Sequence, residues 1–77
     1  PESSTDKYET YVLGRTRLDR LANKYYQNPF YDFLIMYANP QYTSEFDITD
    51  GETIRIPFPL ETAKRLYEVG LEKILNQ

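Results

Sequence analysis

The stretch that decides the fold covers residues 17–39 and reads RLDRLANKYYQNPFYDFLIMYAN. Its first half carries apolar side chains at the spacing of one helical face: Leu18, Leu21, Ala22 and Tyr25. Its second half carries a similar set: Phe30, Phe33, Leu34, Tyr37 and Ala38. Both spacings predict amphipathic helices. We expect Leu21 and Phe33 to be core residues that face a sheet.

Local signals mark where these two helices begin and end. Thr16 is followed three residues later by Asp19, a variant of the capping box that predicts the start of the first helix. Asn28 can cap the second helix, with Pro29 at its first position, where the missing N–H costs nothing. Pro40 is expected to end that helix.

Strand signals lie on both sides of the helical pair. Residues 7–13 (KYETYVL) are rich in strand formers and stop at Gly14, and residues 53–56 (TIRI) alternate in polarity and stop at Pro57. The expected order is strand, helix, helix, strand. An antiparallel two-stranded sheet with both helices on one side is the simplest way to bury the helical faces, which predicts an α+β fold. Such a sheet is marginal alone, so the helices must cover it.

We place this module at residues 7–58. The residues before and after it have different sequence patterns. Residues 1–6 are polar without an apolar period and are expected to be a flexible leader or linker. Residues 59–77 predict a third amphipathic helix with a broad apolar face: Leu60, Ala63, Leu66, Tyr67, Leu71, Ile74 and Leu75. That face either packs on its own module or is an exposed stripe that needs another subunit.

Length and charge exclude several classes of protein. A domain of 77 residues buries only about 60% of the surface that its unfolded chain exposes, so its stability should be marginal. The net charge of −3 provides no electrostatic footprint for nucleic acid, and no apolar run approaches the roughly 18 residues that span a bilayer. Eight Tyr and four Phe predict a small core built from rings.

The residue types argue against an enzyme. The absence of Cys excludes a disulfide framework and a thiolate metal site, and the absence of His removes the usual zinc ligand and general base. The one candidate carboxylate pair, Asp47 and Asp50, lies in a turn-prone loop, where Asp side chains bind nearby backbone N–H groups. We therefore expect no enzymatic activity, no cofactor and no metal.

Several short motifs together resemble a LysM-like module, most closely the LysM-like proteins of contractile-tail baseplates. They lie at residues 17–22, 24–26, 31–34, 38–40, 46–48 and 50–57. The resemblance covers roughly residues 8–58 and stops before the third helix. It implies a non-enzymatic structural module of a phage tail or baseplate, located in the virion tail, that joins tail subunits by protein–protein contacts.

The LysM resemblance also raises an alternative function. Many LysM modules bind N-acetylglucosamine polymers in a groove between the loop after the first strand and the loop before the second. The candidate groove residues here are Gly14, Arg15, Thr16, Asn39, Tyr42 and Phe46. This alternative is a peptidoglycan-binding module of a cell-wall-associated protein. The first loop departs from the sugar-binding pattern because it has one extra residue and two arginines, so we expect no glycan binding.

Candidate contacts to other subunits come from three groups of residues. Arg15 and Arg20 belong to a cationic cluster that could meet an acidic neighbouring subunit. Tyr25 and Tyr37 occupy core positions of their helices, whereas Tyr26 and Tyr31 fall off the apolar faces and are expected to be exposed to a partner. The third helix contributes the remaining candidates: Leu66, Leu71 and Ile74.

Overall fold

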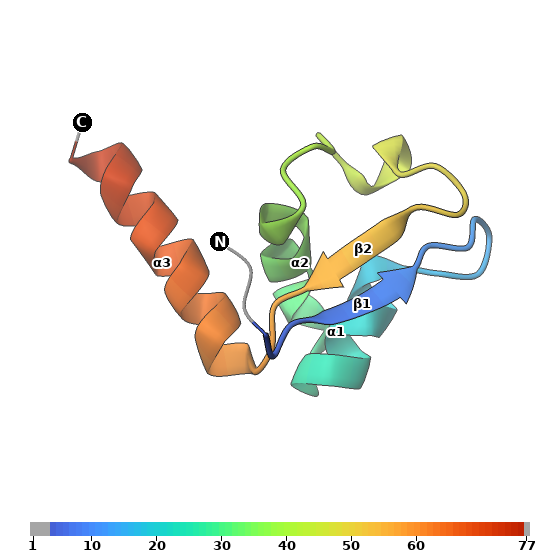
Figure 1. Ribbon diagram of the computed structural model, residues 1–77, viewed down its shortest axis with the longest axis horizontal. Helices are drawn as coiled ribbons and strands as arrows, with labels where there is room; N and C mark the ends of the chain where they lie inside the picture. Colours follow the sequence, from blue (N-terminus) through green and yellow to red (C-terminus); the bar gives the residue numbers. More distant parts are fainter. Residues whose placement is uncertain (1–3, 77) are drawn as a thin grey trace.

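The structure is a computed structural model that describes residues 4–76. Figure 1 shows its elements in chain order, with two short 3₁₀ turns named η1 and η2. They are β1 (Lys7–Thr10), α1 (Leu18–Tyr26), η1 (Pro29–Tyr31), α2 (Asp32–Ala38), η2 (Glu45–Asp47), β2 (Thr53–Ile56) and α3 (Leu60–Leu75).

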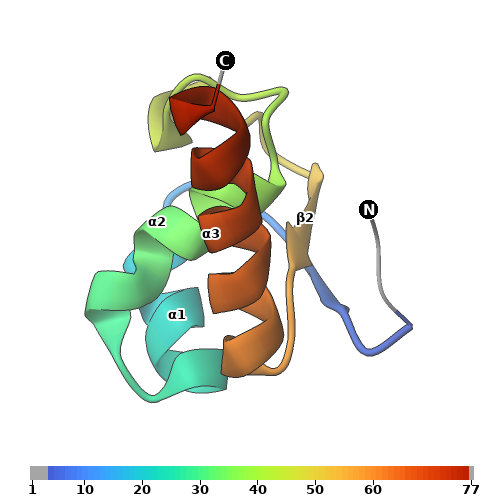
Figure 2. The same cartoon turned by 90° about the vertical axis from the view of Figure 1, so that its left-hand side faces the viewer.

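The two strands form an antiparallel sheet that both central helices cover from one side. Lys7 of β1 lies opposite Ile56 of β2, and Thr10 lies opposite Thr53. Figures 1 and 2 place α1 and α2 on the same side of this sheet. The predicted α+β class, the order of the elements and the bounds of the second strand are therefore confirmed.

The core lies between the sheet and the helices and is mainly aliphatic. Ile35 of α2 and both isoleucines of β2, Ile54 and Ile56, have no exposed surface. Leu21 is buried at 7% exposure, which confirms its predicted place in the core. Within residues 4–76, Tyr11 and Tyr26 are the only buried rings, so the expectation of a core built from rings was largely wrong.

The start of α1 differs from the prediction. Arg17, not Thr16, is the residue before the first helical residue, and its side chain makes no capping hydrogen bond. The Thr16 hydroxyl instead accepts a hydrogen bond of 2.8 Å from the Val12 N–H. The N–H groups of Arg15 and Thr16 both donate to the Val12 carbonyl, and this turn follows β1, which ends at Thr10 and not at Leu13.

The second helical segment buries only part of the predicted face. Leu34 and Ala38 are buried as expected, whereas Phe30, Phe33 and Tyr37 are not. Asn28 caps it as expected, because its side chain accepts a hydrogen bond of 2.9 Å from the Phe30 N–H. The segment then begins as a 3₁₀ turn, which has three residues per turn, so the 3.6-residue spacing counted from Phe30 loses its phase. Phe30 is 83% exposed and Phe33 is 44% exposed, whereas Ile35 is buried.

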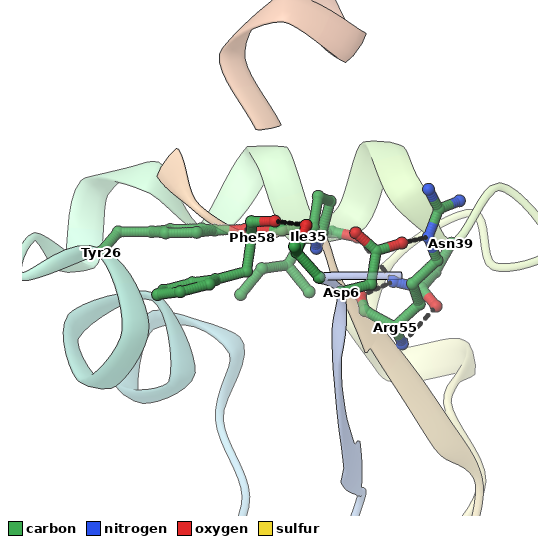
Figure 3. Close-up of polar contacts among 8 residues, drawn as sticks. Asp6, Tyr26, Ile35, Asn39, Arg55 and Phe58 are labelled. Carbon is green, nitrogen blue, oxygen red and sulfur yellow. Dashed lines mark hydrogen bonds and ion pairs between the residues drawn. The ribbon is translucent and has the colours of Figure 1, made fainter. Parts of the chain in front are cut away.

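The predicted leader does not extend to residue 6. The Asp6 side chain is fully buried, and its Oδ2 lies 2.7 Å from the Arg55 Nε (Figure 3). The Thr5 hydroxyl donates a hydrogen bond of 2.6 Å to the Phe58 carbonyl. Thr5 and Asp6 thus bind to β2 and to the residues that follow it. Residues 1–3, which the prediction also included, lie outside the described residues.

The helix α3 packs on its own module over only part of its length. Ala63 is buried, and the Tyr67 ring meets the rings of Phe33 and Tyr37 edge to face, each at a centroid distance of 5.2 Å. The last turns lead away from the rest of the molecule (Figure 1), and Ile74 and Leu75 are 63% and 79% exposed. The first half of the helix therefore packs on its own module, and the second half leaves apolar side chains exposed.

Gly70 marks the end of the packed part of α3 and provides a test of it. A Cβ at this position would lie 1.6 Å from the Tyr37 hydroxyl oxygen, so Gly70→Ala requires the Tyr37 ring or the helix to move. Alanine in a free helix gains about 1 kcal/mol over glycine. We expect urea melts to show no such gain in the native background and the full gain in a Tyr37→Ala background. Equal gains in both backgrounds would mean that α3 does not rest on Tyr37.

Candidate binding surfaces

The first candidate surface is a groove between the loop after β1 and η2. Its volume is about 460 Å³, and Tyr11, Thr16 and Arg17 form part of its lining. Leu13 and Phe46 stand on its two sides and are 68% and 99% exposed. The groove therefore has two solvent-exposed apolar side chains at the loop end of the module.

Glu45 holds the two sides of this groove together. Its Oε2 accepts a hydrogen bond of 2.9 Å from the Tyr11 hydroxyl and one of 3.0 Å from the Leu18 N–H. It therefore caps the first turn of α1 from a loop 27 residues away, a role that no local pattern could indicate. Burial, together with the bond to Glu45, raises the pKa of the Tyr11 hydroxyl.

Asn39 does not belong to this groove, although it was a predicted glycan contact. Its side chain is buried inside the fold, where Nδ2 donates hydrogen bonds of 2.7 Å to the Ile35 carbonyl and 2.8 Å to the Arg55 carbonyl. Its Oδ1 accepts a hydrogen bond of 3.0 Å from the Arg55 N–H (Figure 3). The amide thus pairs with the outer edge of β2 as a neighbouring strand would.

The other predicted groove residues are divided by the structure. Gly14, Thr16 and Phe46 do come together in the groove. Tyr42 lies elsewhere, and its hydroxyl donates a hydrogen bond of 2.7 Å to Glu52, which raises the pKa of Tyr42. Arg15 is exposed but does not line the groove. Half of the predicted glycan surface is therefore present.

The expected exposure of Tyr26 was wrong. Its side chain is only 4% exposed, and its hydroxyl donates a hydrogen bond of 2.5 Å to the Pro57 carbonyl (Figure 3 shows the buried ring). Burial raises the pKa of this hydroxyl well above its usual value. Tyr26 is therefore removed from the candidate interface. Tyr31 is half-buried, with the Lys64 Nζ 5.1 Å from the centre of its ring.

The cationic cluster and the loop carboxylates lie near the loop end of the module, where the first groove is. Arg15 and Arg20 are exposed, and the guanidinium of Arg17 pairs with Asp19 at 2.9 Å. The Asp47 carboxylate accepts hydrogen bonds from two backbone N–H groups of its own loop, and the Asp50 carboxylate accepts one of 2.9 Å from Leu13. Asp47 therefore has the turn chemistry that the sequence indicates, whereas Asp50 bonds a backbone N–H that is 37 residues away in the chain.

A carboxylate on β1 links the sheet to α1. The Oε2 of Glu9 accepts hydrogen bonds from the Lys24 ammonium, at 2.8 Å, and from the Tyr25 hydroxyl. Both hydrogen bonds lower the pKa of Glu9, and the one from Lys24 has the larger effect. Tyr25 was expected in the core, but the structure leaves it half-buried at its edge.

The lowered pKa of Glu9 predicts a specific dependence of stability on pH. A group whose pKa is lower in the folded state contributes stability above its unfolded pKa and loses that contribution as the pH falls through the folded value. We expect the intact chain to lose this contribution below pH 4.5, the unperturbed value, and Glu9→Gln to have a flatter profile there. Thermal melts from pH 7 to 2.5 measure both. Parallel profiles would contradict the assignment.

The second candidate surface is an apolar groove between α2, β2 and the far half of α3. Its volume is about 470 Å³, and its polar lining includes Arg55 and Lys73. Leu66, a predicted interface residue, lines it, whereas Leu71 and Ile74 are exposed on α3 outside the groove. The apolar lining includes Met36, Tyr37, Pro40 and Val69.

Among residues 4–76, no cluster of carboxylates is arranged to hold a metal ion, and no helix is long and apolar enough to cross a membrane. Comparisons of this chain with protein-family models, with curated proteins and with solved structures find no match.

Proposed function

We propose that this chain is a LysM-like structural module of a phage tail or a related contractile apparatus, with the baseplate as its expected place. Its partners are other tail subunits, which it joins by protein–protein contacts in the virion tail. The order β1, α1, α2, β2, with the two strands paired antiparallel, supports the LysM-like part of this proposal because it is the order that the resemblance implies.

The projecting half of α3 is the observation that carries the assembly role. Leu71, Ile74 and Leu75 are exposed there, on a helix that already buries Ala63 against its own module. A small domain gains nothing from apolar side chains that face water, and contiguous patches of this kind mark interaction sites. The module leaves these side chains exposed, so another subunit is the natural cover for them.

The composition of purified tails tests the proposed function. Tails or contractile particles from the source of this sequence are washed in high salt and measured by quantitative mass spectrometry against a labelled copy of the chain. We expect the chain at a fixed ratio to the other tail subunits, unchanged by the wash. Particles with complete tails that lack the chain would contradict the proposal.

Peptidoglycan binding is the alternative, and one observation favours it. The groove beside Phe46 lies between the two loops where the LysM resemblance places a glycan. However, Asn39 and Tyr42, two of the expected sugar contacts, use their polar groups inside the fold. This alternative would place the protein at the cell wall and not in a tail.

We predict that the isolated chain does not bind chitin pentamer. Arg17 puts a charged side chain in the lining of the groove, and the amide of Asn39 already has its hydrogen-bond partners. An NMR titration measures this directly. Saturable shifts around Gly14 and Phe46, with a dissociation constant below about 1 mM, or roughly −4 kcal/mol, would favour the cell-wall function instead.

A further inference from the structure

We propose that copies of this chain associate head to tail, with Phe46 of one copy seated in the groove between α2 and α3 of the next copy. This inference rests on the proposed assembly role and specifies one of its contacts. It follows from two surfaces of the same molecule that fit each other in shape, polarity and charge.

The first of these surfaces is the exposed ring of Phe46. The loop that carries it is fixed by several contacts. Its side chain is 99% exposed, although the residues around it are fixed. Ser44 and Asp47 close a capping box around η2, and the next residue, Ile48, is buried in the core. Glu45 is tied to α1 through its bond to the Leu18 N–H. Because the backbone that carries the ring is already held in place, binding costs the conformational entropy of the side chain alone.

The second surface is the groove between α2 and α3, which has room for such a ring. Its volume is about 470 Å³, whereas a cavity of about 150 Å³ already accommodates benzene. Met36, Leu66 and Val69 provide apolar walls, and the Tyr37 hydroxyl fills the space beside Gly70. The groove can therefore receive the ring together with part of the backbone that carries it.

The charges around the two surfaces are opposite. Phe46 stands between two acidic residues, Glu45 and Asp47, and Asp47 is exposed. Two cationic residues line the groove: Arg55, whose guanidinium pairs with the buried Asp6, and Lys73, which is exposed. Complementary charge at the rim of an apolar contact fixes the orientation of the partner and speeds its encounter. The acidic flank of Phe46 thus matches the exposed ammonium of Lys73 at the rim of the groove.

The two surfaces lie at different ends of the molecule, which determines the kind of assembly. In Figure 1, η2 (yellow) lies at the loop end of the sheet and α3 (orange to red) at the other end. A copy that binds through Phe46 therefore keeps its own groove open for another copy. Contacts of this heterologous type build rings when they close and filaments when they do not, and both are found in symmetric assemblies.

Sedimentation velocity of the full chain and of matched variants tests this contact. Phe46→Ala removes the ring, and Phe30→Ala removes another largely exposed ring as its control. Val69→Glu puts a carboxylate in the groove, and Val12→Glu makes the same change at a valine of similar exposure outside it. We expect the intact chain and both controls to associate as concentration rises, and the two test variants to associate at least tenfold more weakly.

An equimolar mixture of the two test variants distinguishes this contact from a symmetric one. The Phe46→Ala copy keeps an intact groove, and the Val69→Glu copy keeps an intact ring, so one contact can form between them. We expect a 1:1 complex that grows no further. A two-fold symmetric contact would not be restored by mixing, so the absence of a complex would overturn the proposal.

Two further results would also overturn the head-to-tail contact. One is an intact chain that stays monomeric up to about 1 mM, and the other is loss of association in the controls to the same extent as in the test variants. Circular dichroism melts verify that each variant is folded. If the head-to-tail contact is not found but the chain is present in purified tails, only the contact is wrong and the proposed function stands. If the chain associates head to tail but is absent from tails, only the proposed function is wrong.

Discussion

Replacement of Arg55 by Met is expected to lower the free energy of unfolding by about 3 to 5 kcal/mol, because it leaves the Asp6 carboxylate without its guanidinium partner. The Asp6 side chain has no exposed surface, and its Oδ2 lies 2.7 Å from the Arg55 Nε. A domain of this length has a total stability of roughly 4 to 12 kcal/mol. Urea melts should therefore show a midpoint at much lower urea, and a variant already unfolded in water if the intact chain lies at the low end of that range.

The double variant Asp6→Asn, Arg55→Met is the control for that result. It removes the buried charge together with its partner, so part of the lost stability should return. Asp6→Asn alone leaves a guanidinium that is 17% exposed and partly hydrated, and it should cost less than Arg55→Met alone. A cost below about 1 kcal/mol for Arg55→Met would show that residues 4–6 are not bound to β2 as the structure has them.

Ile35→Ala is the second substitution with a large expected effect. The side chain has no exposed surface and lies in the core cluster, so the loss of its buried atoms and the cavity left behind should cost about 2 to 5 kcal/mol. Phe33→Ala removes a larger side chain that is 44% exposed and meets the Tyr67 ring edge to face. It should cost only about 1 kcal/mol.

The comparison of these two variants tests which side of α2 faces the core. Denaturant melts of both are compared with the intact chain under the same conditions. A cost for Phe33→Ala as large as that for Ile35→Ala would favour the helical face expected from the sequence over the face in the structure.

The parts of the fold that the sequence predicted correctly depend on local signals. The alternation of residues 53–56 marks β2, Asn28 before Pro29 marks a helical start, and Leu21 lies on an apolar line within one regular helix. Each of these patterns depends only on neighbours within about two turns. The α+β class then follows from the order of the elements.

The errors have two physical causes. The 3₁₀ turn before α2 shifts the phase of the helical pattern, so Phe33 is half-exposed and Ile35 is buried. The other errors depend on contacts between residues that are far apart in the sequence. Asp6 binds Arg55, and Asn39 pairs with the edge of β2, and neither partner could be identified from spacing alone.

The candidate interface was only partly predictable for the same reason. The apolar pattern of α3 indicated that the helix is amphipathic, but only the structure divides it into a packed half with Ala63 and a projecting half with Ile74 and Leu75. Tyr26 lost its candidate role because its hydroxyl reaches the Pro57 carbonyl, 31 residues away. The groove that includes Val69 and Lys73 is formed by three elements and has no signature in any one of them.

Tail assembly without this chain is the most direct measurement of the proposed role. The gene is deleted from the virus or cell that carries it, and particles are counted and inspected by electron microscopy. We expect tails to be missing or arrested before completion, and expression of the full chain in trans to restore them. Complete, functional tails in the deletion strain would contradict an essential assembly role for this protein.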